Sequence, residues 1–247
     1  MPNINDSYFD GAYKELWRTI IPDVLTVKEV EFMIPYFNLK SGRKVLDLMC
    51  GYGRHSIGLA KKGIEVTAVD NLDAYINEIN NIAAKEHLPV KAIKTDIINY
   101  QPADKYELAI CMGNSFNFFD EADALKLLTT ISSCLQAGGY LLINSWSIAE
   151  IAYKSFSSSN SSQVGDVQFQ NELKFLLHPT RIETESTMTT PDGNSEIKNG
   201  IDYIYSLNEM EKMMNAAGLS LKEVYSIPGR KKFTLGEPRA YLVAEKK

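Results

Sequence analysis

From about residue 43, short β-rich segments alternate with longer segments of helical periodicity, and this alternation restricts the fold more than any other feature. The expected strands are Lys44–Met49, Glu65–Val69, Val90–Lys94, Tyr106–Met112 and Tyr140–Asn144. The clearest helices between them are Asp73–Glu86 and Asp120–Leu135. Strands that alternate with helices in this way form βαβ units, with parallel strands and with helices on both faces of the sheet. We therefore predict an α/β fold with a doubly wound, mostly parallel sheet.

A change of pattern after the fifth strand predicts an insertion. Six of the eight residues in 155–162 are serine, which is typical of a mobile loop. Strand-like alternation follows at Val167–Leu177, Arg181–Thr190 and Ser195–Tyr205, with a turn at Pro191–Asn194. The α/β pattern then resumes with a helix at Leu207–Ala217 and strands at Leu219–Ser226 and Arg239–Glu245. The prediction is a seven-stranded sheet with an antiparallel β insertion after the fifth strand.

Composition excludes several classes of protein. With 45% hydrophobic residues and a net charge of −5, the chain is not globally disordered, and its acidity argues against a nucleic-acid partner. Its apolar runs are too short to span a bilayer and its N-terminus lacks the features of a secretory signal, so we expect no membrane association and a cytoplasmic location. Cys50, Cys111 and Cys134 are odd in number and far apart, which favours reduced core residues over disulfides or a metal site.

A glycine-rich turn, with Gly51 and Gly53, follows the first strand. Glycines allow a tight turn and a close approach of the backbone to a ligand, and the helix that begins here offers free N–H groups. Asp70 ends the second strand 19 residues after Gly51, a spacing suited to a carboxylate that binds a ribose diol. Ligands of such folds bind beyond the carboxyl ends of the strands, where Asp96 and Asn114 also lie.

Two cofactors, a dinucleotide and S-adenosylmethionine, are compatible with this turn. The dinucleotide fingerprint has a third glycine where this chain has Ser56. In addition, the carboxylate of Asp47 lies only four residues before Gly51, which disfavours a pyrophosphate. The residues therefore favour S-adenosylmethionine.

The segment Asp47–Gly53 resembles the fingerprint of the class I S-adenosylmethionine-dependent methyltransferases, in which an acidic residue precedes three spaced glycines. Met49 departs from that pattern, because the family usually has its first glycine there. We interpret this change as one of packing at the strand end, which puts in doubt only a backbone contact to the ligand at this residue.

Further motifs of the same family follow in the same order. Asp70 with Asn71 matches the acidic position after the second strand, and Asp96 with Ile97 matches the adenine-side position after the third. The segments Cys111–Phe116 and Leu135–Ile143 match the motifs around the fourth and fifth strands. The resemblance covers residues 43–145 well and the last forty residues moderately.

The resemblance implies a single Rossmann-like domain with S-adenosyl-L-methionine as cofactor and S-adenosyl-L-homocysteine as product. Its parts are an N-terminal helical cap (1–40), a cofactor-binding core (41–150), an inserted antiparallel lid (151–206), and a C-terminal helix and strands that complete the sheet (207–247). The cofactor-binding residues that it implies are Asp47, Cys50, Gly51, Gly53, Arg54, Asp70, Asn71, Asp96, Ile97, Met112, Gly113, Asn114, Tyr13 and Trp17. Arg54 is suited to the methionyl carboxylate, whereas the two cap aromatics either close over the cofactor or pack on the core.

The expected reaction is transfer of a methyl group to an O or N atom of a small molecule. In-line displacement needs alignment and exclusion of water more than covalent chemistry. Gly113–Phe119 contains no Asn-Pro-Pro-Tyr motif, which with the acidity disfavours methylation of nucleobases. We expect the acceptor pocket between the strand edge and the insertion. Its expected residues are Phe116, Trp146, Arg181 and Tyr203, with His178 as a candidate general base.

Three alternatives remain open at this point. The insertion is compatible with a dimer interface as well as a lid, so both a monomer and a homodimer are possible. The domain is also compatible with a non-catalytic S-adenosylmethionine-binding sensor or assembly protein. A nicotinamide-dependent oxidoreductase is the third and weakest alternative, and titration of both cofactors distinguishes it.

Overall fold

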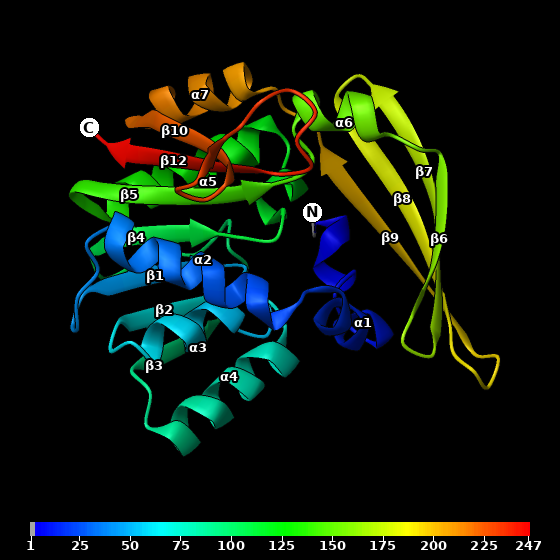
Figure 1. The fold of residues 1–247 in the computed structure, drawn as a ribbon, viewed down its shortest axis with the longest axis horizontal. Coiled ribbons are helices and arrows are strands. Elements are labelled where there is room, and N and C mark those ends of the chain that lie inside the picture. The colour runs from blue at the N-terminus through cyan, green and yellow to red at the C-terminus, as the bar shows by residue number, and fades with distance from the viewer. Residues whose placement is uncertain (1–2) are drawn as a thin grey trace.

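The computed structural model describes residues 3–247, and eight strands of this part of the chain form one large sheet (Figure 1). The strand order is β11-β10-β12-β5-β4-β1-β2-β3. The five neighbouring strands β5, β4, β1, β2 and β3 are parallel to one another. The pairs β11–β10, β10–β12 and β12–β5 are antiparallel. The strands are β1 (Lys44–Leu48), β2 (Glu65–Asp70), β3 (Val90–Lys94), β4 (Tyr106–Cys111), β5 (Leu135–Ser145), β10 (Leu219–Ile227), β11 (Lys231–Lys232) and β12 (Ala240–Lys246). The predicted doubly wound sheet is confirmed, and the two-residue edge strand β11 is added to the seven predicted strands.

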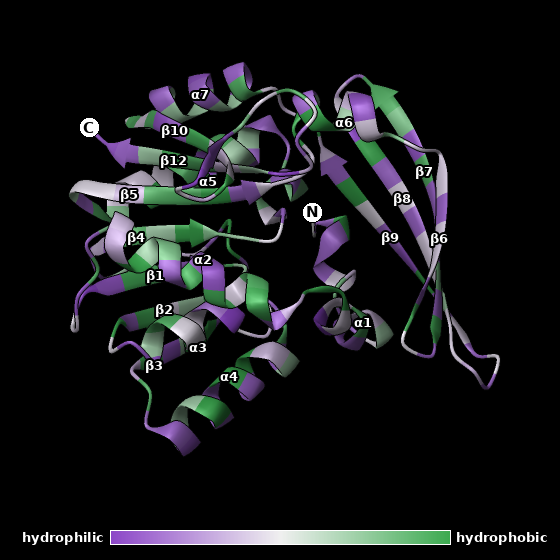
Figure 2. Cartoon of the chain, viewed as in Figure 1, coloured by the Kyte–Doolittle hydropathy of each residue, from purple (hydrophilic) through white to green (hydrophobic). Residues whose placement is uncertain are grey.

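Helices cover both faces of this sheet because successive side chains of a strand point to opposite sides. On β1, Val45 belongs to the cluster of Met33 from α2, whereas the next residue, Leu46, belongs to the cluster of Leu127 from α5. One face carries α2 (Asp23–Tyr36), α3 (Arg54–Ala60) and α4 (Asp73–Glu86), and the other carries α5 (Glu121–Cys134) and α7 (Leu207–Ala216). Figure 2 shows β4 as hydrophobic towards its C-terminal end, as expected for a strand segment that is buried on both faces.

The insertion forms a separate four-stranded antiparallel sheet, seen on the right of Figure 1. Its strands are β6 (Ser159–Val164), β7 (Val167–Leu177), β8 (Thr180–Thr189) and β9 (Ser195–Tyr203), and the short helix α6 (Ala149–Ser155) precedes them. The antiparallel insertion is as predicted, but the prediction of a loop over 155–162 is wrong for residues 159–162, which belong to β6. Residues 159–164 pair with β7 through a tight turn at Gly165, so pairing with a neighbouring strand overrides the low β-propensity of serine.

The N-terminal segment lies between the two sheets (Figure 1). It contains a 3₁₀ turn, η1 (Ile4–Ser7), and helix α1 (Ala12–Ile20). Asn5 forms two hydrogen bonds of 2.9 Å with the backbone of Ile201 in β9, one as donor and one as acceptor. Tyr8 makes a 2.6 Å hydrogen bond with Ser186 of β8. This segment therefore connects the insertion to the core. Within the described residues, no helix has the length and apolarity needed to cross a membrane.

Candidate active site

The glycine-rich turn is built from residues with positive φ at the end of β1. Met49, Gly51 and Gly53 have φ values of +53°, +56° and +78°. An added Cβ at Gly51 would meet no atom within 4 Å, whereas one at Gly53 would lie 2.6 Å from the Cγ1 atom of Ile79 in α4. Gly51 therefore faces open space, as expected for close approach of a ligand. Gly53 instead allows α3 and α4 to pack, so its role differs from the predicted ligand contact.

Asp70 lies beside this turn at the end of β2. Its Oδ2 atom accepts a 2.8 Å hydrogen bond from the backbone N–H of Gly51, and its Oδ1 atom accepts one of 3.0 Å from Leu72. Burial raises the pKa of Asp70 to about 6, although both backbone hydrogen bonds oppose the shift. The carboxylate is thus fixed in position by the turn, and its remaining lone pairs are available to hydroxyl donors.

A cavity of about 950 Å³ lies over these strand ends. This volume includes space that is open to solvent. The sequence-predicted residues that line it are Trp17, Asp47, Cys50, Gly51, Arg54, Asp70, Asn71, Asp96, Ile97, Met112 and Gly113. The structure therefore brings most of the predicted cofactor residues to one cavity. The sequence analysis missed the contributions of the N-terminal segment, of which Asn3, Asn5, Asp6 and Phe9 also line this space.

Two of these residues are held by partners of their own. Ser56 donates a 2.6 Å hydrogen bond to Asp47, which is buried, and burial raises the pKa of that carboxyl group. Arg54 donates a 2.7 Å hydrogen bond to Glu29 of α2, which also binds His55. Burial tends to raise the pKa of Glu29, but the hydrogen bond from His55 and the charge of Arg54 outweigh it and lower the pKa to about 2. Arg54 is therefore fixed at the edge of the cavity by a buried carboxylate that the sequence analysis did not single out.

A second cavity, of about 470 Å³, adjoins the first and extends to the insertion. We call it the acceptor cleft; five residues line both spaces, namely Asn5, Phe9, Trp17, Gly113 and Phe118. The cleft is further lined by Tyr8, Tyr13, Asn114, Trp146, Thr184, Gly200, Ile201 and Asp202. Of the two cap aromatics, Trp17 lines both cavities, whereas Tyr13 lines only the acceptor cleft, and both also pack in a hydrophobic cluster with Leu16. A pocket between the strand edge and the insertion was expected, and the structure has one there.

Asn114 organises the floor of the acceptor cleft. It has φ = +69° just after β4, and its Oδ1 atom accepts hydrogen bonds from the backbone N–H groups of Trp146 (2.9 Å) and Ser147 (3.0 Å). Its Nδ2 atom donates to Ser147 at 2.9 Å and to Asp202 at 3.2 Å. This side chain therefore fixes the end of β5 and the end of β9 relative to each other.

Asp202 is a further cleft residue that the sequence analysis missed. It lies on β9 opposite Ile182 of β8 and lines the cleft. Ser147 donates a 3.0 Å hydrogen bond to its Oδ2 atom, and burial raises the pKa of Asp202 to about 6. Acidic residues are uncommon on the inward face of a strand, so an inward Asp202 would have indicated a functional site. Which face Asp202 occupies depends on the register of β9, which the sequence does not specify.

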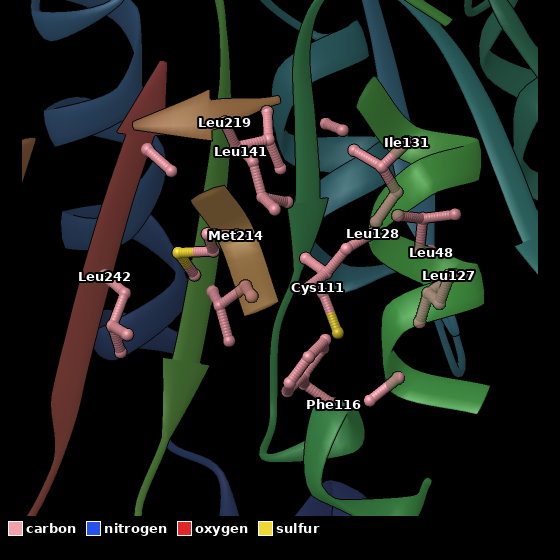
Figure 3. Packing of buried hydrophobic residues seen from close by; sticks show 14 of the residues in the cluster. Leu48, Cys111, Phe116, Leu127, Leu128, Ile131, Leu141, Met214, Leu219 and Leu242 are labelled. Atoms are coloured by element: carbon pink, nitrogen blue, oxygen red, sulfur yellow. The ribbon is translucent and has the colours of Figure 1, made fainter. Parts of the chain in front are cut away.

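Besides Gly53, four predicted residues line neither cavity. Phe116 is completely buried and points towards Cys111 in the main core (Figure 3). His178 is exposed at the turn between β7 and β8, too far along the insertion to line either space. Arg181 forms an ion pair with Glu183 on the outer face of the small sheet. Tyr203 follows Asp202 and so points to the opposite face, where it packs on the main core. The predicted roles of these four residues in the acceptor pocket and in base catalysis are therefore corrected.

The sheet order, the glycine turn and the carboxylate beside it define the fold of a class I methyltransferase. A family model described as "Methyltransferase domain" matches residues 45–139. A glycine/sarcosine N-methyltransferase from Aphanothece halophytica is 27% identical over 161 residues, which are 63% of this chain and 60% of the relative, so the match spans less than two thirds of that protein. Over its cofactor-binding core, this chain is therefore similar to S-adenosylmethionine-dependent methyltransferases.

Solved structures agree with this fold. An S-adenosylmethionine-dependent methyltransferase from Clostridium acetobutylicum superposes with a TM-score of 0.82 at 20% identity, over 95% of this chain and 96% of that one. CalS10, an amino pentose methyltransferase from Micromonospora echinaspora determined with bound cofactor, superposes with a TM-score of 0.72 at 18% identity, over 96% and 98% of the two chains. The match extends over the insertion, so the small sheet is part of a shared architecture.

Proposed function

We propose that this protein is an S-adenosylmethionine-dependent methyltransferase that methylates a nitrogen atom of a small-molecule amine. The observation that carries the proposal is the pair of adjoining cavities. One lies over the strand ends and has the residues of a nucleoside cofactor site, and the other is aromatic and contains one carboxylate. Their shared wall is the place where an acceptor atom and a methyl donor would meet.

The residues at the strand ends fit the cofactor. Asp70, held by the turn, suits the two ribose hydroxyls, and Asp96 at the end of β3 suits the adenine side. Arg54 suits the methionyl carboxylate, and Glu29 would keep the guanidinium in place. When bound, S-adenosylmethionine supplies an electrophilic methyl group on a positively charged sulfur. The chain itself contributes alignment, the exclusion of water by aromatic walls, and electrostatic support.

The carboxylate of Asp202 favours nitrogen over oxygen as the accepting atom. A protonated amine would donate a charge-assisted hydrogen bond to Asp202 and contact the faces of Trp17 and Trp146. Because an ammonium nitrogen has no lone pair, it would have to transfer this proton to Asp202 before it could accept a methyl group, and the raised pKa of Asp202 suits that role. A neutral hydroxyl group gains neither the ion pair nor the cation–π contact. The similarity to a glycine/sarcosine N-methyltransferase agrees with a nitrogen acceptor.

The proposal is tested by calorimetry with S-adenosylmethionine and S-adenosylhomocysteine, followed by transfer of labelled methyl groups into matched libraries of amines and alcohols. We expect saturable binding of both cofactor forms and labelling of amines. Labelled alcohols without labelled amines would contradict the nitrogen assignment. Binding without transfer to any acceptor in either library would favour the non-catalytic sensor.

The remaining partner assignments belong to the same proposal. We expect a free small molecule and no nucleic acid as acceptor, in keeping with a net charge of −5. A cytoplasmic location is expected, and both a monomer and a homodimer fit the proposal. Light scattering of the purified protein at several concentrations distinguishes these two states.

A further inference from the structure

The acceptor cleft contains a single charged side chain. Of the described residues that line it, Asp202 is acidic and the others are aromatic, aliphatic, amide, hydroxyl or glycine residues; lysine, arginine and histidine are absent from this lining. Arg54 lines the cofactor cavity and not the cleft, and it is the residue assigned above to the methionyl carboxylate. A negative charge that enters the cleft would therefore find no positive side chain there.

The contacts of Asp202 lead to the same conclusion. Its two oxygen atoms accept hydrogen bonds from neutral donors, the Ser147 hydroxyl at 3.0 Å and the Asn114 amide at 3.2 Å. Among the described residues it takes part in no ion pair. Burial raises its pKa, and no positive charge opposes that shift. Asp202 is partly buried, and a carboxylate withdrawn from water without a cation is costly unless a ligand supplies one.

We propose that the acceptor is a cationic amine without a carboxylate next to its nitrogen, and that Asp202 enforces this selection. This inference rests on the proposed function. It separates the chain from its glycine/sarcosine relatives, whose names specify acceptors with a carboxylate one carbon away from the amine. In an α-amino acid, the ammonium and carboxylate groups are attached to the same carbon atom. Contact of the ammonium group with Asp202 would therefore bring the carboxylate close to the same acidic side chain.

We expect a large difference in affinity between an amine and an amino acid because two effects disfavour the carboxylate of the amino acid in the cleft. The acceptor carboxylate would lose its water without gaining a cationic partner, and it would be repelled by Asp202. Like charges placed together at a dry interface and unpaired desolvated charges are the usual means of rejecting a ligand. We expect affinities for an amine and for its carboxylate-bearing counterpart to differ by about 100-fold or more.

Intrinsic fluorescence provides a direct test that does not depend on turnover. The chain has two tryptophans, Trp17 and Trp146, and both line the acceptor cleft. The full-length protein is saturated with S-adenosylhomocysteine and titrated with matched pairs in which only the carboxylate is neutralised. Suitable pairs are glycine with glycinamide and phenylalanine with phenylalaninamide, and 2-phenylethylamine serves as the ligand without a carbonyl group.

The expected result is a saturable change with at least one amide or with 2-phenylethylamine, and a response to the amino acids that is weaker by about 100-fold. In Asp202→Asn, amine binding falls by at least tenfold and the gap between amide and amino acid narrows. Asp166→Asn, in the exposed turn between β6 and β7, is the matched control and leaves both unchanged. Equal binding of an amino acid and its amide to the wild type overturns the inference, even if the Asp202 variant does not fold.

The outcome is separable from that of the proposed function. If calorimetry detects no binding of S-adenosylmethionine or S-adenosylhomocysteine, the proposed function fails whatever the fluorescence shows. If the cofactor binds and glycine or sarcosine is methylated as efficiently as the corresponding amide, the methyltransferase proposal stands and the selection against carboxylates fails. Unchanged cofactor affinity in Asp202→Asn confirms that the variant affects the acceptor side alone.

Discussion

Replacement of Asp70 with asparagine is expected to lower cofactor affinity while it changes the pH dependence of stability in the free protein. The wild-type carboxylate is held at 2.8 Å from the N–H of Gly51 and faces the cofactor cavity. Hydrogen bonds from hydroxyl groups to a charged acceptor contribute about 1.5–3 kcal/mol. The loss of this contribution in the neutral variant corresponds to an increase of about 10- to 150-fold in the Kd for S-adenosylhomocysteine.

The effect on stability follows from the raised pKa of Asp70, which is about 6 in the folded protein against a model value of 3.8. Because the folded-state pKa is the higher one, the associated stability is fully present below pH 3.8 and is lost as the pH rises through 6. A difference of about two units corresponds to about 3 kcal/mol. Asparagine removes this dependence, although one of the two backbone N–H groups loses its acceptor, at a cost of about 1–3 kcal/mol.

Wild type is therefore expected to be more stable than Asp70→Asn at pH 4, and the difference should shrink or reverse by pH 7.5. Thermal unfolding without cofactor across this range measures the change, and calorimetry with S-adenosylhomocysteine at pH 7.5 measures the affinity. Asp166→Asn, which is exposed, controls for the loss of one charge. Unchanged Kd would refute the role of Asp70 at the cofactor, and parallel stability curves would refute the argument from burial.

Three further predictions follow from the same geometry. Gly51→Val should abolish cofactor binding because its side chain enters the open space, and it should also lower the Tm because a branched residue is strained at φ +56°. Gly53→Ala should mainly lower the Tm because its Cβ meets Ile79; calorimetry and thermal unfolding separate the effect on binding from the effect on stability. Glu29→Gln should destabilise the fold by about 3 kcal/mol at pH 7 because it breaks a buried ion pair. In acid titrations, the pKa of about 2 for Glu29 means that this wild-type advantage is lost as the pH falls from 4.5 towards 2. His178→Ala should leave kcat and KM within about twofold of wild type, as expected for an exposed surface residue, and a large loss of turnover would restore it as a candidate base.

The cofactor edge was predictable because its determinants are local. Hydrophobic periodicity identified the parallel strands, and the carboxyl ends of such strands lie at one edge whatever the long-range details. Residues placed at those ends, such as Gly51, Asp70 and Asp96, were therefore expected in one cavity, and they line one. Gly53 was assigned to the ligand because its partner, Ile79, lies in another helix that the motif does not describe.

The acceptor side was less predictable because it depends on contacts between distant segments. Asp202 and Tyr203 are neighbours in the chain, and only the pairing of β9 with β8 decides which of them faces the cleft. A shift of one residue in register would exchange their positions. The edge strand β6 shows the same dependence: the serine-rich composition favoured a loop, whereas the turn at Gly165 and the partner β7 make residues 159–164 a strand.

The N-terminal segment is the element on which both cavities depend. Phe9 and Trp17 line the cofactor cavity and the acceptor cleft at once. The segment is fixed to the small sheet by the hydrogen bonds of Asn5, and to the core by the paired 2.8 Å hydrogen bonds from Arg18 to Glu78 of α4. Because these anchors lie on different layers, a movement that opens the cleft also displaces a wall of the cofactor cavity. Exclusion of water from the two sites is therefore a property of one segment, which makes access of the acceptor and retention of the cofactor interdependent.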